Sequence, residues 1–378
     1  MRWPLGVASS GTSCGIKRGG KLDLGMIVLE TPALWAGAFT RNGAAAPSVR
    51  WCRSLLGKRV SAIVVNSGNA NACTGPAGSQ AVERIATGAS QALSRAPNEI
   101  LVASTGPIGV PLPIEKIERH LPQAITDTSA DTESFSKSIL TTDTTLKRAS
   151  ARIGEATIVG VAKGAAMLAP NMATMLAFLA TDAVLDPKSL ALAVRGAVDK
   201  SFNRICVDAC ESTNDSVFLV ATERSEEVDP HLFEKALTQV CWDLARQIVA
   251  DAEGATKFVR VVVGGTESDA DAVALGRAVA GSALWRAAVN GGDPNWGRVL
   301  AALGTIERSL PIERVRVSIG NEFVFDGRPV GSIEHATQSM SGREVVVTCE
   351  VGHGPGSAEV LTSDLSATYV ELNAGGMS

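Results

Sequence analysis

Short β-type runs alternate with amphipathic helical stripes along the whole chain, and this alternation is the strongest constraint on its fold. The candidate strands cover residues 24–29, 62–65, 100–103, 150–153, 156–161, 258–263, 315–319 and 345–351. Apolar residues at helical spacing predict helices over residues 82–93, 232–249 and 272–283. Gly154-Glu155, between two of the runs, predicts a tight hairpin turn. This mixture predicts sheets with helices packed on them, although nothing in the sequence marks a domain boundary.

The composition is that of a globular protein and argues against a nucleic-acid partner. Hydrophobic residues make up 45% of the 378 residues and charged residues 20%, which suits more than one domain-sized unit. The net charge is −4, and no lysine- or arginine-rich run offers a basic surface. One Tyr and six Trp leave few rings on which bases could stack.

One segment invites comparison with a membrane-spanning helix. No residue from Gly164 to Thr181 is charged, and this stretch is close to the minimum length of such a helix. However, Pro170-Asn171 interrupts its middle, and an asparagine without a partner is costly in lipid. We therefore expect a buried segment that contains a turn, and no membrane partner. The seven cysteines form no CxxC pair, which favours reduced thiols in a cytoplasmic protein.

The sequence also lacks the usual motifs for metals and organic cofactors. The four histidines are widely separated, and no two of them have the spacing of metal ligands. Neither a GxxxxGK[ST] loop nor a GxGxxG turn after a strand is present to bind a nucleotide phosphate. We therefore expect neither a metal nor an organic cofactor.

A loop followed by an apolar run surrounds Thr174. The ordinary interpretation is a turn that leads into a core strand or helix, with Thr174 as its cap. The functional interpretation is that Thr174 is a nucleophile. With no histidine evidently placed as its base, its own α-amino group could serve once the Ala173–Thr174 peptide bond is cut. An α-amine has a pKa of about 8, so part of it is neutral at cytoplasmic pH.

A second cluster, Ser104-Thr105-Gly106-Pro107, follows a candidate strand. It has the composition of an ordinary Gly/Pro turn. It could also form an oxyanion hole, with the Thr105 hydroxyl and the Gly106 N–H as the two donors. Each donor of this kind typically lowers a reaction barrier by ~3–4 kcal/mol.

Taken together, several motifs resemble the ornithine acetyltransferase family, also called glutamate N-acetyltransferases, of the bifunctional arginine biosynthesis type. The matching motifs are KGAAMLAPNMATMLAFLATDA at 163–183, NSGNANACTG at 66–75, STGPIG at 104–109, TTDT at 141–144, DAEGATK at 251–257 and DPNWGRV at 293–299. They occur in the order of the family and extend over essentially the whole chain.

The resemblance implies an α+β fold, a layered α/β/β/α sandwich of the self-cleaving peptidase-like type. It implies cleavage between Ala173 and Thr174 into an α chain, 1–173, and a β chain, 174–378, assembled as α2β2. By the same resemblance Thr174 is the nucleophile, and Thr105 and Gly106 form the oxyanion hole. The substrate-binding positions that it implies are Thr141, Lys163, Thr174, Glu253, Asn373 and Ser378.

The activity implied by the resemblance is transfer of acetyl from N2-acetyl-L-ornithine to L-glutamate, in a ping-pong scheme through acetyl-Thr174. The resemblance leaves open whether acetyl-CoA is a second acetyl donor. Two alternatives remain at this point. One is an N-terminal-nucleophile amide hydrolase on the same scaffold, and the other is a catalytically silent amino-acid-binding protein.

Overall fold

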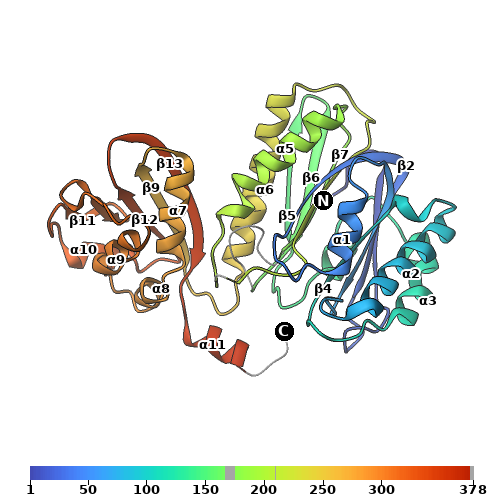
Figure 1. The fold of residues 1–378 in the computed structure, drawn as a ribbon, viewed down its shortest axis with the longest axis horizontal. Coiled ribbons are helices and arrows are strands. Elements are labelled where there is room, and N and C mark those ends of the chain that lie inside the picture. The colour runs from blue at the N-terminus through green and yellow to red at the C-terminus, as the bar shows by residue number, and fades with distance from the viewer. Residues whose placement is uncertain (167–174, 209, 375–378) are drawn as a thin grey trace.

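The computed structural model describes residues 1–166, 175–208 and 210–374, and these form a large and a small lobe (Figure 1). The strands of the large lobe are β1 (Val7–Thr12), β2 (Leu24–Phe39), β3 (Val60–Ser67), β4 (Ile100–Thr105), β5 (Lys147–Ile153), β6 (Ala156–Lys163), β7 (Leu176–Thr181) and β8 (Ser216–Ala221). Its helices are α1 (Pro47–Ser54), α2 (Gly75–Leu93), α3 (Ile114–Thr126), α4 (Glu133–Ser138), α5 (Pro187–Asp199) and α6 (Pro230–Ala250).

The small lobe contains the remaining strands and most of the remaining helices. These elements are β9 (Phe258–Gly265), α7 (Asp269–Ala280), α8 (Ala283–Asn290), α9 (Trp296–Ile306), β10 (Arg316–Ile319), β11 (Glu322–Asp326), α10 (Ile333–Ser339), β12 (Glu344–Glu350) and β13 (Gly354–Ser363). Short 3-10 turns cover Pro97–Glu99, Phe202–Arg204 and Ile312–Arg314. The last helix, α11 (Ala367–Ala374), follows β13.

The long strand β2 joins two halves of one sheet in the large lobe. The strand order is β4-β3-β2-β8-β7-β6-β5, with β1 paired to β2. Residues 24–28 of β2 pair with β3, whereas residues 34–39 pair with β8, and the register shifts between Val28 and Ala33. A shift of this kind bends a strand, so the sheet turns into two layers.

Alternating side chains of these strands show how the two layers pack. Ile63 of β3 and Leu101 of β4 share a buried core with Phe178 of β7 and Phe218 of β8, whose rings stack at 5.4 Å. The neighbours of these residues along each strand point the other way. On β3 and β4 they pack against α2 and α3, and on β7 and β8 they pack against α5 and α6. The large lobe is therefore the predicted α/β/β/α sandwich.

Most of the predicted elements are confirmed, with longer bounds. The hairpin at Gly154-Glu155 joins β5 and β6, and Gly154 has the positive φ of 57° that favours glycine in such a turn. The predicted helix over 272–283 extended too far, because α7 ends at Ala280 and a separate helix, α8, begins at Ala283. The uncharged segment before Thr181 ends in β7, which is buried along its whole length.

The small lobe has its own core around a sheet of order β11-β10-β12-β9-β13. Val261, Val317 and Val347 from this sheet pack with residues of α7, α9 and neighbouring helices. The lobe begins near Phe258, a boundary that the sequence did not mark. It does not coincide with the division at 173/174, because β7, β8, α5 and α6 of the large lobe all follow that division.

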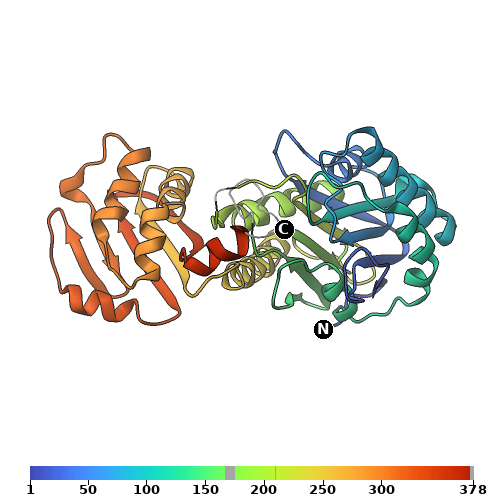
Figure 2. The same cartoon turned by 90° about the horizontal axis from the view of Figure 1, so that it is seen from below.

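Helix α11 leads back from the small lobe toward the large lobe (Figures 1 and 2). Ser366 Oγ donates a hydrogen bond of 2.6 Å to the Gly254 carbonyl. Gly254 has a φ of +66°, and a Cβ there would lie 2.4 Å from the Tyr369 nitrogen. Helix α11 is thus packed closely on the 251–257 loop. Among the helices described, none has the length and apolar character needed to span a bilayer.

Candidate active site

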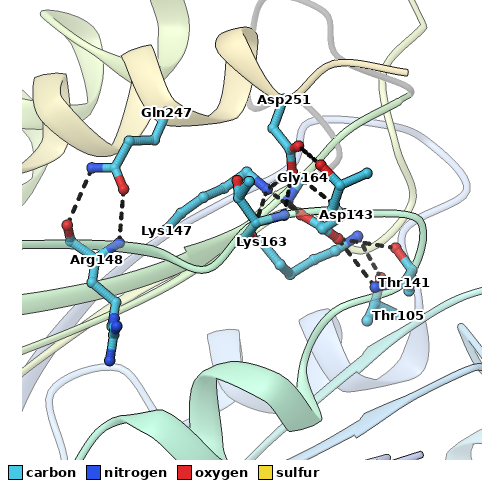
Figure 3. Close-up of polar contacts among 11 residues, drawn as sticks. Thr105, Thr141, Asp143, Lys147, Arg148, Lys163, Gly164, Gln247 and Asp251 are labelled. Atoms are coloured by element: carbon cyan, nitrogen blue, oxygen red, sulfur yellow. Dashed lines mark hydrogen bonds and ion pairs between the residues drawn. The ribbon is translucent and has the colours of Figure 1, made fainter. Parts of the chain in front are cut away.

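Lys163 and Thr105 bring the two layers of the sandwich together at one edge. Thr105 is the last residue of β4 in one layer, and Lys163 is the last residue of β6 in the other. Lys163 Nζ donates a hydrogen bond of 3.3 Å to Thr105 Oγ1, and both side chains are buried (Figure 3). Because the Thr105 oxygen accepts from Lys163, its own proton remains available to a further acceptor.

Gly106 occupies a backbone position that only glycine fits. Its φ is +137°, and a Cβ there would lie 2.4 Å from the Asn69 nitrogen. The Asn69 N–H donates to the Thr105 carbonyl at 3.0 Å, so the turn packs directly on the 66–75 loop. The two predicted oxyanion donors therefore stand on a backbone held in a fixed conformation.

Polar side chains of the 66–75 loop and of the segment before β8 support this turn. Asn66 Oδ1 accepts from Ser104 Oγ at 2.7 Å. Asn214 Nδ2 donates to the Ala70 carbonyl at 2.7 Å and to the Ser104 carbonyl at 2.8 Å. These buried amides are satisfied by the protein itself, so we assign them a supporting role.

Asp143 connects Thr141 with the residue that follows Lys163 (Figure 3). Asp143 Oδ2 accepts from the Thr141 N–H at 3.1 Å and from Thr141 Oγ1 at 3.5 Å. Asp143 Oδ1 accepts from the Gly164 N–H at 2.6 Å and from Lys147 Nζ at 2.8 Å. The TTDT motif singled out Thr141, whereas the aspartate beside it makes most of the contacts.

Opposing charges set the protonation of the buried groups around Lys163. Burial lowers the pKa of Lys163, and the negative charge of Asp143 acts to raise it. Burial acts to raise the pKa of Asp143. The positive charges of Lys163 and Lys147, together with hydrogen bonds to Lys147 and Gly164, nevertheless hold it well below its usual value. Asp143 is therefore ionised throughout the neutral range.

Glu253 contacts the segment after Lys163 and the C-terminal helix. Its N–H donates to the Ala165 carbonyl at 2.9 Å. Its Oε2 accepts from Asn373 Nδ2 at 3.0 Å, so these two positions are in contact. Its Oε1 is buried and has no hydrogen-bond partner among the described residues. That oxygen can accept a hydrogen bond from a ligand cation.

Two further residues, Asp215 and Lys17, were not among the predicted site residues. Met175 N–H donates to Asp215 Oδ1 at 3.0 Å, and burial raises the pKa of Asp215 well above its usual value. Lys17 Nζ donates to the Leu22 carbonyl at 2.9 Å and to the Leu140 carbonyl at 2.5 Å. Burial lowers the pKa of Lys17 to about 8, with Lys163 among the charges that act on it. Only the tertiary contacts identify these residues.

The predicted site residues thus fall into two groups, those that the structure describes and those that it does not. The structure brings together Thr105, Gly106, Thr141, Lys163, Glu253 and Asn373. Thr174, the cleavage partner Ala173 and the C-terminal Ser378 lie outside the described residues. The DPNWGRV motif lies at the start of α9 in the small lobe, where Asn295 Oδ1 accepts from the Arg298 N–H at 3.3 Å. Its visible role is that of a helix cap.

Comparison with known proteins shows which family this chain resembles. The model of the ArgJ family matches residues 8–377. The arginine biosynthesis bifunctional protein ArgJ of Thermus thermophilus is 44% identical over 377 residues, covering 99% of this chain and 98% of the relative. The ArgJ protein of Thermobifida fusca is 42% identical, covering 98% of each.

Two solved structures are also similar. A crystal structure of ArgJ from Bacillus halodurans is 35% identical, with a TM-score of 0.49, and the match covers 52% of this chain and 96% of that one. Ornithine acetyltransferase of Mycobacterium tuberculosis, complexed with ornithine, is 34% identical with a TM-score of 0.43, covering 45% and 95%. The family-model match and the near full-length identity to curated relatives show that this chain belongs to the ArgJ family.

Proposed function

We propose that this chain is an N-acetyltransferase of arginine biosynthesis that moves acetyl from N2-acetyl-L-ornithine to L-glutamate. The observation that carries the proposal is the hydrogen bond between Lys163 and Thr105 at the edge where β7 begins. At that edge lie the Thr105 hydroxyl, the buried Lys163 side chain and the start of β7, two residues after the predicted nucleophile. Relatives named arginine biosynthesis bifunctional protein and ornithine acetyltransferase support the substrate assignment.

Self-cleavage precedes the transfer reaction. Thr174 Oγ attacks the Ala173 carbonyl, the bond to the Thr174 nitrogen breaks, and an ester forms. The broken bond leaves the Thr174 nitrogen as a free α-amine. Water then hydrolyses the ester, which frees the Ala173 carboxylate and the Thr174 hydroxyl. The anchoring of Met175 by Asp215 supports this step, because it fixes the residue bonded to the Thr174 carbonyl.

The acetyl group is then transferred in two halves. The neutral α-amine accepts the proton of Thr174 Oγ, which attacks the acetyl carbonyl of N-acetylornithine. The Thr105 hydroxyl and the Gly106 N–H donate to the oxyanion. The C–N bond breaks, ornithine leaves with a proton, and acetyl-Thr174 remains. The glutamate amine attacks this ester, and Thr174 Oγ regains its proton as N-acetylglutamate leaves.

The charged ends of the substrates match the charges at the site. The Lys163 ammonium suits a substrate carboxylate. Glu253 Oε1, which has no hydrogen-bond partner in the described part of the chain, suits an ammonium. Asn373 on α11 holds Glu253 in place, and Ser378 lies farther along the same tail. Asp143 accepts from both the N–H and the hydroxyl of Thr141, and also from the N–H of Gly164, the residue after Lys163.

The proposal extends to assembly and location. The two chains produced by cleavage form an α2β2 heterotetramer in the cytoplasm. Acetyl-CoA is a second acetyl donor, in keeping with the bifunctional name of the relatives. The chemistry above uses only groups of the chain, so neither a metal nor an organic cofactor is required.

Intact mass spectrometry of the purified protein and of Thr174→Ala tests the proposal. The wild type should give fragments of 173 and 205 residues (378 − 173 = 205), and the variant should stay whole. Acetyl transfer to glutamate should follow in the wild type alone. A single full-length species with no transfer would contradict the mechanism. Release of acetate that does not depend on glutamate would indicate an amide hydrolase instead.

A further inference from the structure

A buried group of three charged side chains lies directly behind the candidate site. Lys147 Nζ is 2.8 Å from Asp143 Oδ1 and 2.5 Å from Asp251 Oδ2. The side chains of Lys147 and Asp143 are fully buried, and that of Asp251 is 7% exposed. We call Asp143, Lys147 and Asp251 the buried triad (Figure 3). Burying such charges is costly unless they are paired and hydrogen-bonded, so their arrangement is a specific feature of the fold.

The two carboxylates of the buried triad have different outward partners. Asp143 contacts the site through the N–H groups of Thr141 and Gly164. Asp251, at the end of α6, accepts from the N–H of Thr144 at 2.9 Å and from that of Thr145 at 3.2 Å. Asp143 therefore connects the buried triad to the site, whereas Asp251 fastens the loop before β5 to α6.

The charges of the buried triad also act on Lys163, with opposite signs. Asp143 favours the charged form of Lys163, and Lys147 disfavours it. Conversely, Lys163 is the strongest of the charges that keep Asp143 ionised. The ionisable groups that face Lys163 from the surrounding elements are Lys17, Asp143, Lys147, Asp215 and Glu253.

We propose that Asp143 is a positioning residue of the acetyl-transfer site, which holds Thr141 and Gly164 in place around Lys163 and supplies a negative charge that faces its ammonium. This inference rests on the proposed function, in which the Lys163 ammonium binds a substrate carboxylate. Asp143 acts through its neighbours and does not itself take part in the chemistry.

The inference makes predictions of opposite sign for two members of the buried triad. Asp143→Asn removes a negative charge beside Lys163, so the pKa of Lys163 falls. Lys147→Met removes a positive charge, so the pKa of Lys163 rises. An opposite charge at short range typically changes a pKa by about 1 to 3 units. General damage to the fold would not move the two variants in opposite directions.

The experiment is the pH profile of kcat/KM for N-acetylornithine, measured on self-cleaved wild type, Asp143→Asn and Lys147→Met. Binding needs charged Lys163, so activity is lost as the pH rises through its pKa. In Asp143→Asn, this loss of activity at high pH, the alkaline limb of the profile, should move to lower pH by about 1 unit or more. In Lys147→Met it should move to higher pH. An unmoved limb, or movement of both variants in the same direction, would overturn the inference.

Asp251→Asn is the matched control, because it removes a carboxylate from the same lysine without touching Thr141 or Gly164. Its alkaline limb should move less than that of Asp143→Asn, and equal movement would contradict a special role for Asp143. If Asp143→Asn fails to fold, the direction in Lys147→Met still decides the matter. If the wild type is active but the alkaline limbs of the variants do not move, only this inference is refuted. A wild type without acetyl transfer would refute the proposed function.

Discussion

The backbone N–H of Met175 donates a hydrogen bond of 3.0 Å to Oδ1 of Asp215, a carboxylate that is only 1% exposed. Asp215 immediately precedes β8, and Met175 immediately precedes β7, its parallel neighbour in the sheet. The second carboxylate oxygen, Oδ2, makes no hydrogen bond within the described part of the chain. The contact fixes the position of Met175, the residue that follows the predicted nucleophile in the sequence.

Asp215→Ala should slow self-cleavage. The substitution leaves the buried Met175 N–H unpaired, at a cost of about 1–3 kcal/mol, which corresponds to roughly tenfold slower cleavage if the cost falls on the reacting geometry. Asp215→Asn keeps an acceptor oxygen and should mature faster than Asp215→Ala. Intact mass measured during expression gives both rates. Maturation of Asp215→Ala at the wild-type rate would show that the contact serves the fold only.

Thr105→Val should lower kcat for acetyl transfer. The substitution preserves the shape of the side chain but removes a hydroxyl predicted to stabilise the oxyanion, which is typically worth about 10²- to 10³-fold in kcat. Thr105→Ser retains the hydroxyl and should keep most of the activity. Steady-state kinetics on fully cleaved protein measure the effect. A valine variant as active as the serine variant would exclude Thr105 from the oxyanion hole.

Lys163→Met should raise KM for N-acetylornithine and for glutamate. A hydrogen bond to a charged group contributes about 1.5–3 kcal/mol, so we expect roughly a 10- to 100-fold increase. Burial lowers the pKa of Lys163, so in the wild type the binding charge is present at low pH and lost as the pH rises through that pKa. Lys163→Arg keeps its charge at all accessible pH values and should lack this alkaline loss. Persistence of the same alkaline limb in Lys163→Arg would assign it to another group.

Glu253→Gln should weaken binding of the substrate ammonium while leaving the fold intact. The amide can still accept from Asn373, but the charge that faces a ligand cation is gone. The loss of a charged hydrogen bond predicts a KM about tenfold higher or more. Glu371→Gln, which removes an exposed carboxylate on α11, is the control and should bind normally. Equal KM values for the two variants would remove Glu253 from the substrate site.

The sequence predicted the elements of the sandwich better than their arrangement. The run at 24–29 indicated a strand, but β2 continues through Glu30-Thr31-Pro32 to Phe39, a stretch that breaks the expected pattern. The register shift at this point turns one sheet into two layers. Strand β8 was missed, and the run that forms β7 was predicted only as a core strand or helix. Both faces of these strands are buried, so neither shows the alternation of a half-exposed strand.

The residues of the candidate site also differ in whether the sequence could identify them. Thr105, Lys163 and Glu253 stand in motifs whose resemblance to a family identified them, and the structure places them at one edge of the sandwich. Lys17 and Asp215 reach the same edge from distant parts of the chain. Their burial and their partners are properties of the folded protein, and no local pattern of residues encodes them.

Strand β7 pairs with β6 on one side and with β8 on the other. A cut between residues 173 and 174 would therefore leave the first strand of the 174–378 chain in the middle of a sheet. The two products would then be held together only by noncovalent contacts, and an unfolded mature protein would have to reassemble from two separate polypeptides. Its refolding would be second order, and its midpoint of thermal unfolding would rise with protein concentration. In the uncut Thr174→Ala chain, each protomer would refold in a first-order reaction, and only the pairing of protomers would depend on concentration.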